Sequence, residues 1–258
     1  MTPYQRPKRR PRTSNGYVLL DHAWAERLGV RRSGGLYRIG RRELADRLAA
    51  LTAAKPLVEQ LQADIHALAP NQPPGDDLVT LGGCPHVVGF YETAASLAGS
   101  VRDFLAPGLR ANDAAIVVAS AFHRALFSRA LEKVGIDVRA AQRSGRYIAL
   151  DASAMLSTFM VTCLPDAARF SATIEKLIDR APPGTRNVRI YGEMVAVLWD
   201  QGNVTAAIEL ERLWNDLAVK DLFSLFCAYP IRAFDTEAGA EQFRQVCAQH
   251  SAVMPPVG

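Results

Sequence analysis

Short apolar runs alternate with stretches of helical periodicity from about residue 80 to residue 256. Runs rich in β-branched and aromatic residues predict strands, whereas apolar positions three and four residues apart predict helices. The predicted strands are 86–92, 114–120, 146–151, 187–192 and 222–230, and the predicted helices are 96–112, 122–135, 152–160, 166–182, 193–203, 204–220 and 238–253. This alternation predicts an α/β fold, in which a mainly parallel sheet carries helices on both faces. The run 222–230 is continuously apolar, which is typical of a central strand.

The first third of the chain has a different pattern. Residues 1–15 are rich in proline and arginine and are predicted to form a disordered basic tail. Residues 16–69 predict a small, mostly helical segment that begins with a short strand or turn and contains a β-turn feature near 34–44. The Pro- and Gly-rich stretch 70–80 predicts a linker, so 81–256 is the predicted α/β domain.

Composition places the chain among ordinary globular proteins. It has 258 residues, of which 49% are hydrophobic and 22% charged. No apolar run approaches the roughly 18 residues that a membrane-spanning helix needs, and no secretory signal is present. The four cysteines lie far apart without a CxxC pair, which favours reduced thiols and a cytoplasmic protein.

Positive charge is concentrated at the start of the chain. Residues 1–47 contain 12 Lys or Arg and 4 Asp or Glu, a net charge of +8 against +4 for the whole chain. Such a segment attracts phosphate backbones or anionic surfaces, although a solvated tail has the same composition. The candidate nucleic-acid contacts are Arg31, Arg32, Arg38, Arg41 and Arg42.

Polar residues gather where the predicted strands end. In open parallel sheets, ligands bind beyond the carboxyl ends of the strands. The strand-end residues are Tyr91, Glu92, Ser120, Asp151, Glu193 and Tyr229. The first strand-to-helix turn, FYETAASLAGS, has no glycine run and no lysine, so it is not a phosphate-binding loop. GxSxG, HExxH and GxGxxG are also absent, so we expect no catalytic residues and no enzyme activity.

Glu193 is the most informative carboxylate because apolar sequence lies on both sides of it. A carboxylate in such a position must be solvated or paired, since burying it alone is costly. It fits the first turn of the following helix, where free amides and the helix dipole stabilise negative charge. It also fits a ligand site at the strand end, and the residues alone leave both interpretations open.

Histidine and cysteine offer a weaker signal. Cys247 and His250, three residues apart, share a face of the last predicted helix. Together with His86 and either Cys84 or Cys227 they could form a site for a soft metal. We expect a packed cysteine beside a partly exposed histidine instead, because dedicated sites show tighter local pairing of ligands. No metal and no cofactor is therefore predicted.

Six segments, in order, resemble the MEDS domain, the methanogen/methylotroph sensory domain named after a dichloromethane-responsive repressor. They are HVVGFYET, GRYIALDASAMLSTFM, RIYGEMVAVLWDQGN, LERLWNDLA, FSLFCAYP and VCAQHSAVMP, within residues 82–256. The resemblance implies a relative of the RecA and circadian-clock ATPase fold that has lost its phosphate loop. It also implies a sensor of small molecules, C1 or hydrocarbon-derived compounds, that occurs fused to DNA-binding or histidine-kinase modules or alone. It raises the expectation that Glu193 faces a ligand. The expected ligand-binding residues are His86, Tyr91, Glu92, Asp151 and Glu193.

Residues 17–48 faintly resemble the winged helix of excisionases, with a basic YRIGRREL wing. The usual recognition helix is almost absent, because only RRSG separates the parts, and major-groove reading needs that helix. DNA binding would then depend mainly on phosphate contacts. A degenerate module kept for dimerisation or partner docking is the equal alternative.

The sequence therefore predicts a cytoplasmic, non-enzymatic small-molecule sensor, acting as a transcriptional regulator and as a homodimer. The alternative is a protein-interaction module of a two-component or anti-sigma pathway, with a histidine kinase or another signalling protein as partner and no DNA contact. Residual nucleotide binding is a third hypothesis, and we expect titration with ATP and magnesium to give no heat.

Overall fold

The computed structural model describes residues 17–20, 32–33, 36–40, 86–218, 223–234 and 239–254, the three N-terminal pieces as backbone only. The chain divides into two compact units, Met1–Lys55 and Pro56–Gly258. The predicted basic tail, the N-terminal helices and the linker lie outside the described residues.

The N-terminal unit contains an antiparallel sheet of strand order β1-β3-β2. Its strands are β1 (Tyr17–Leu20), β2 (Arg32–Ser33) and β3 (Leu36–Gly40). Of the two predicted alternatives at residue 17, strand or turn, the strand is observed. Arg32 lies in β2 and Arg38 in β3, where Arg38 is paired with Leu19. The other three candidate arginines, Arg31, Arg41 and Arg42, lie outside the described residues.

The second unit is built on a six-stranded sheet in which every neighbouring pair of strands is parallel. The order is β11-β4-β10-β9-β5-β6, with β4 (His86–Tyr91), β5 (Ala114–Ala119), β6 (Tyr147–Asp151), β9 (Val188–Gly192), β10 (Phe223–Pro230) and β11 (Ala252–Met254). The predicted α/β class and the central place of the last long strand, β10, are confirmed.

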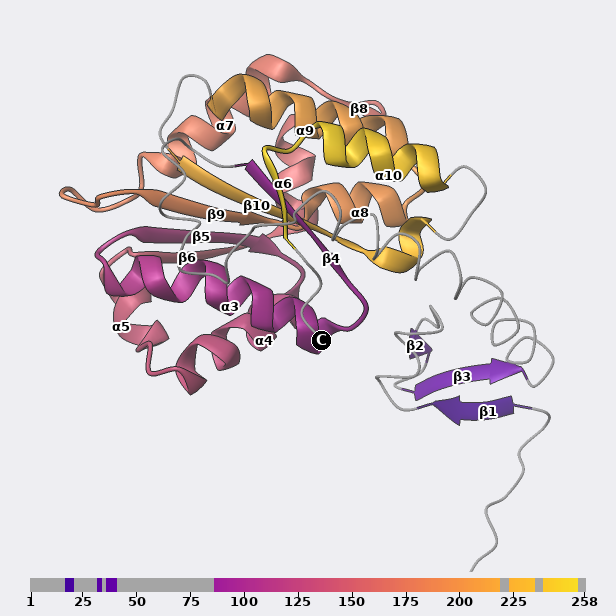
Figure 1. Cartoon of the computed structure of the whole chain (residues 1–258), viewed down its shortest axis with the longest axis horizontal. Helices are drawn as coiled ribbons and strands as arrows, with labels where there is room; N and C mark the ends of the chain where they lie inside the picture. Colours follow the sequence, from indigo (N-terminus) through magenta and orange to yellow (C-terminus); the bar gives the residue numbers. More distant parts are fainter. Residues whose placement is uncertain are drawn as a thin grey trace, which may run out of the picture. The chain divides into compact units, whose positions relative to one another are not determined.

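Helices cover both faces of this sheet (Figure 1). One face carries α3 (Ala94–Arg110), α4 (Ala121–Lys133) and α5 (Val138–Arg143). The other carries α6 (Ala152–Phe159), α7 (Ala167–Ile178), α8 (Met194–Asp200), α9 (Val204–Ala218) and α10 (Gly239–Ala248). Successive strand residues belong to opposite cores, as Ile190 and Tyr191 do, because side chains alternate across a sheet.

Three elements differ from the sequence prediction. The predicted helix 238–253 is wrong beyond residue 248, where α10 ends and the edge strand β11 follows. Pairing with β4 decides this, since Ser251 N donates to His86 O at 2.8 Å. The short helix α5 and the hairpin of β7 (Met160–Val161) and β8 (Leu164–Pro165) were not predicted. None of the described helices combines the length and apolar character needed to cross a bilayer.

Arg189 of β9 forms a buried ion pair with Asp113, in the turn between α3 and β5, and also bonds to the backbone of α3. Arg189 Nε donates to Asp113 Oδ2 at 2.9 Å, and Arg189 Nη1 donates to the Phe104 carbonyl at 2.9 Å. The two charged side chains are only 5% and 7% exposed. Gly108 makes room for this pair, because a Cβ added there would lie 2.1 Å from Arg189 Nε.

We expect Gly108→Ala to lower the free energy of unfolding by about 1–3 kcal/mol, the usual cost of overpacking. The matched control is Gly99→Ala in the same helix, where an added Cβ would meet only Arg102 Nη2, at 4.0 Å. The control should stabilise the protein by up to about 1 kcal/mol, because alanine is the better helix former. Urea unfolding of both variants measures the difference, and equal stability would show that the ion pair yields to the extra methyl group.

Candidate functional site

The chain leaves two neighbouring strands, β5 and β9, toward opposite faces of the sheet. β5 is followed by α4 on one face, and β9 is followed by α8 on the other. Such a divergence opens the carboxyl edge of a parallel sheet and is where ligands bind in this class of fold. Ser120 and Glu193 are the first residues beyond the two strands.

The Glu193 carboxylate bridges these two strand ends. Its Oε2 accepts a hydrogen bond from Ser120 N at 2.7 Å, and its Oε1 lies 2.7 Å from His123 Nδ1. Glu193 is 7% exposed and makes no side-chain cap on α8, the helix that it precedes. The carboxylate lies instead at the amino end of α4, where free amides and the helix dipole favour negative charge. The interpretation of Glu193 as a first-turn residue of the following helix is therefore wrong, and its carboxylate is stabilised at the start of the neighbouring helix α4 instead.

His123 is the residue that this arrangement positions, and no sequence pattern had selected it. Since a carboxylate only accepts, His123 Nδ1 donates to Glu193. The ring packs among three aromatic rings, Phe127 stacked at 5.6 Å, Phe122 at 5.3 Å and Tyr91 edge-on at 6.4 Å between ring centres. His123 is 7% exposed, and its Nε2 is buried without a hydrogen-bond partner among the described residues.

The other residues predicted at the carboxyl edge of the sheet differ in how they relate to His123 and Glu193. Tyr91 is half-buried and touches the His123 ring, whereas Glu92 is exposed. Asp151, at the end of β6, caps α6 by accepting from Ala154 N at 3.0 Å and pairs with Arg124 Nη1 at 3.0 Å. The Ala154 amide and then Arg124 hold the pKa of Asp151 below its usual value. Tyr91 and Glu193 therefore meet at His123, and Asp151 joins the same helix through Arg124.

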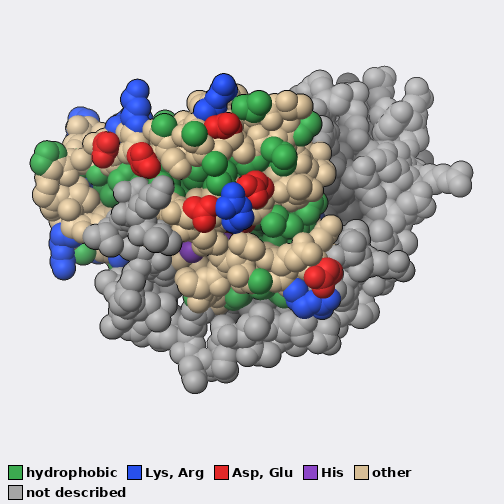
Figure 2. Space-filling model, turned by 90° about the horizontal axis from the view of Figure 1, so that it is seen from above, with side chains coloured by type: hydrophobic (Ala, Val, Ile, Leu, Met, Phe, Trp, Pro, Cys, Tyr) green, Lys and Arg blue, Asp and Glu red, His purple; other side chains and the backbone are tan. Residues whose placement is uncertain are grey.

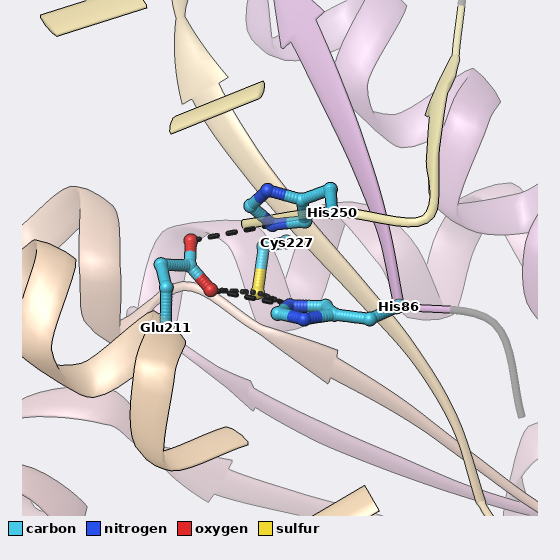
Figure 3. A group of neighbouring side chains, drawn as sticks. All are labelled: His86, Glu211, Cys227 and His250. Carbon is cyan, nitrogen blue, oxygen red and sulfur yellow. Dashed lines mark hydrogen bonds and ion pairs between the residues drawn. The ribbon is translucent and has the colours of Figure 1, made fainter. Parts of the chain in front are cut away.

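His86, also predicted to bind the ligand, does not lie at the carboxyl edge of the sheet. It is the first residue of β4 and Tyr91 is the last, so about 16 Å of extended strand separates them. His86 lies instead in a second cluster with Glu211, Cys227 and His250, in which one potential ligand atom from each residue lies within 4.8 Å of the others (Figure 3). Of the thiols considered from sequence, Cys227 is in this cluster, Cys247 is not, and Cys84 lies outside the described residues.

Glu211 anchors the second cluster and is fully buried. Burial by itself would raise the pKa of the Glu211 carboxyl, but His250 and His86 outweigh it and hold that pKa well below its usual value. Burial and the nearby Glu211 charge raise the pKa values of Cys227 and Tyr229. Sequence reasoning missed Glu211, although it interrupts the apolar stripe Ala207, Leu210, Trp214 and Leu217 of α9.

Comparison with known proteins agrees with this architecture. The sequence model described as MEDS, "MEthanogen/methylotroph, DcmR Sensory domain", matches residues 85–251, well over half of the chain. The matched range contains both clusters. No curated protein matches the chain.

Proposed function

The chain belongs to the MEDS family of sensory domains, and on that basis we propose that it is a non-enzymatic cytoplasmic sensor that reads a small molecule at His123. The observation that carries the proposal is a buried histidine Nε2, at the carboxyl edge of the sheet, with no hydrogen-bond partner in the part of the chain that the structure describes. A buried polar atom without a partner costs about 1–3 kcal/mol, and a ligand that bonds to it recovers that cost.

The geometry favours a small ligand with a hydrogen-bond donor and an apolar body. Because Glu193 holds the proton on Nδ1, a neutral His123 presents a lone pair at Nε2. The surrounding rings of Tyr91, Phe122 and Phe127 favour an apolar body beside that donor. A short alcohol has both features, in keeping with the hydrocarbon-derived ligands that the family resemblance implies.

We also propose that the scaffold is a RecA-type sheet without its phosphate loop. Only Glu92 and Thr93 separate β4 from α3, and Thr93 caps that helix through Ser96 N at 3.1 Å. A two-residue turn without glycine offers no loop of backbone amides around a phosphate. This supports a ligand other than a nucleotide at this edge.

Native mass spectrometry of the purified full chain tests the sensor proposal. A co-purified compound should appear as an added small mass that is lost on denaturation, and it should be absent from Glu193→Ala. If the chain purifies without a ligand, methanol, ethanol and 1-butanol serve as probes in thermal-shift measurements. If no added mass is found and none of the three alcohols gives a saturable shift, the proposal that His123 binds a ligand is overturned.

For the output, we propose a transcriptional regulator whose basic N-terminal segment binds DNA as a homodimer. Net positive charge is confined to residues 1–47. On the face that carries α7, α9 and α10, basic side chains lie beside acidic ones rather than in a patch (Figure 2). Arg212, for example, pairs with both Glu209 and Asp216. This intermixing supports assigning nucleic-acid contacts to the N-terminal segment.

We expect the double variant Arg41→Ala/Arg42→Ala to weaken binding to duplex DNA and to reduce the slope of log affinity against log salt by about 2. The matched control, Arg139→Ala/Arg143→Ala, removes the same charge from exposed positions on α5 and should leave the slope unchanged. Fluorescence anisotropy across a salt series measures both. The absence of binding at low salt would favour the alternative, an interaction module without DNA contact.

A further inference from the structure

Four side chains from segments far apart in sequence meet on the face of the sheet that carries α9. His86 comes from β4, Glu211 from α9 and Cys227 from β10, and His250 lies between α10 and β11 (Figure 3). His86 Nε2 lies 3.1 Å from Glu211 Oε2 and 3.5 Å from Cys227 Sγ. Cys227 Sγ lies 3.3 Å from Glu211 Oε2, and His250 Nε2 lies 3.5 Å from Glu211 Oε1.

These spacings are those of atoms that share a tetrahedral metal ion. With zinc–nitrogen and zinc–oxygen bonds of about 2.0–2.1 Å and zinc–sulfur bonds of about 2.3 Å, neighbouring ligand atoms lie roughly 3.3–3.6 Å apart. The three separations among His86 Nε2, Glu211 Oε2 and Cys227 Sγ are 3.1–3.5 Å, and His250 Nε2 lies 3.5 Å from the other carboxylate oxygen, Oε1. The remaining pairs lie within 4.8 Å, so a small closure of His250 completes the tetrahedron.

Neighbouring groups fix both histidines in the orientation that a metal requires. His250 Nδ1 lies 2.7 Å from the Val246 carbonyl, which can only accept. His86 Nδ1 lies 2.8 Å from Asn215 Oδ1, and Asn215 Nδ2 donates to the Gln249 carbonyl at 2.8 Å, which fixes the orientation of the amide. Both Nδ1 atoms therefore donate away from the cluster, so both Nε2 atoms point into it. Metal-binding histidines are typically held in this way.

Inside the cluster, Glu211 Oε2 accepts from the Cys227 thiol, a weak donor, at 3.3 Å. Both Nε2 atoms face the Glu211 carboxylate, an arrangement that is favourable only with a proton on each Nε2 or with a cation between the imidazoles and the carboxylate. His250, whose side chain has no exposed surface, has an Nε2 that makes no hydrogen bond among the described residues. Tyr229 OH donates to Glu211 Oε1 at 2.7 Å, which orients the carboxylate without satisfying either imidazole. A cation at the centre would bond to the carboxylate, to both Nε2 atoms and to the Cys227 sulfur.

We propose that His86, Glu211, Cys227 and His250 bind one zinc ion in a closed, structural site. Imidazole, thiolate and carboxylate are ligands that zinc accepts together, whereas calcium and magnesium require oxygen alone. A divalent ion with one thiolate and one carboxylate is electrically neutral, which suits full burial. Binding releases the Cys227 thiol proton to solvent.

Such a site would hold the edge of the sheet together. It joins β4, β10 and α9 to the segment that leads into the edge strand β11, whose pairing with β4 spans only three residues. Removing the metal should therefore loosen residues 249–254 first. The zinc site lies at the opposite end of β4 from Tyr91, so it is separate from the ligand site at His123.

Elemental analysis and cobalt substitution of the full chain test the assignment. We expect about one zinc per chain after dialysis and, on exchange with Co²⁺, a thiolate charge-transfer band with tetrahedral d–d bands. Cys227→Ala should abolish the band, whereas Cys163→Ala, at an exposed thiol, should retain it. Glu193→Gln should keep its zinc, so the test is independent of the ligand proposal.

A second variant keeps the test decisive if Cys227→Ala does not fold. Cys84→Ser/Cys163→Ser/Cys247→Ser leaves Cys227 as the only thiol and should keep the charge-transfer band. Chelation of zinc from the wild-type chain should lower Tm by several degrees. Substoichiometric zinc, or metal binding that survives in a folded Cys227→Ala variant, would overturn the proposal in favour of a hydrogen-bonded ionic cluster or an adventitious ion only.

Discussion

Replacing Glu211 with alanine is expected to lower the free energy of unfolding by about 3–5 kcal/mol, the usual cost of removing one partner from a buried ionic cluster. Glu211 is fully buried and is the common partner of His86, His250 and the Tyr229 hydroxyl. Its loss leaves two buried imidazoles without their carboxylate partner and a phenol without an acceptor. Chemical denaturation of the full chain gives the value.

The matched control for this prediction lies two residues earlier on the same helix. Glu209→Ala removes a carboxylate whose side chain is 36% exposed and whose partner, Arg212, is 50% exposed. Its expected cost is below about 1 kcal/mol, the range of surface ion pairs. Similar losses for the two variants would show that the Glu211 cluster contributes no more than a surface pair.

Glu193→Gln is expected to weaken binding of a short-alcohol probe by about tenfold or more, the equivalent of one charge-assisted hydrogen bond. A glutamine can still accept from Ser120 N through its oxygen, but its amide group then faces His123 Nδ1 as a donor. The imidazole must therefore move its proton from Nδ1 to Nε2, where it repels a ligand that donates. Titration of the probe by calorimetry measures the change.

The fold should tolerate this change, because the amide keeps the size and two hydrogen bonds of the carboxylate. Glu132→Gln, at an exposed position near the far end of α4, is the matched control and should leave probe affinity unchanged. A large fall in Tm of Glu193→Gln with unaltered probe affinity would make Glu193 a purely structural residue.

The sequence predicts those parts of the fold that local periodicity determines. The β-branched run AAIVVA predicts a strand, and helical spacing predicts the helix that ends in LEK. Both are observed, as β5 and α4. No local pattern predicts β11, because AVM forms a strand only through its pairing with β4, which is more than 160 residues away in the sequence. Long-range pairing of this kind leaves no local periodicity for a sequence pattern to reveal.

Among the candidate site residues, too, some could be selected from sequence and others could not. Glu193 could be selected from sequence because a carboxylate within an apolar run is conspicuous. His123 could not, because its importance comes from Glu193, 70 positions away and on a neighbouring strand end. His86, Cys227 and His250 could be considered as ligands by residue type, but their meeting point depends on strand register and on α10 ending before His250.

The long-range proton–nitrogen NMR spectrum of the His123 ring is the most direct test of the proposal that His123 Nε2 binds a small ligand. In the full chain the ring should carry its proton on Nδ1, and methanol, ethanol or 1-butanol should shift the Nε2 resonance with a saturable dependence on concentration. The Phe122→Ala variant should retain the tautomer while changing the affinity for the longest alcohol. An Nε2-protonated ring in the free wild-type protein, or an Nε2 resonance that none of the three alcohols moves, would contradict the proposal.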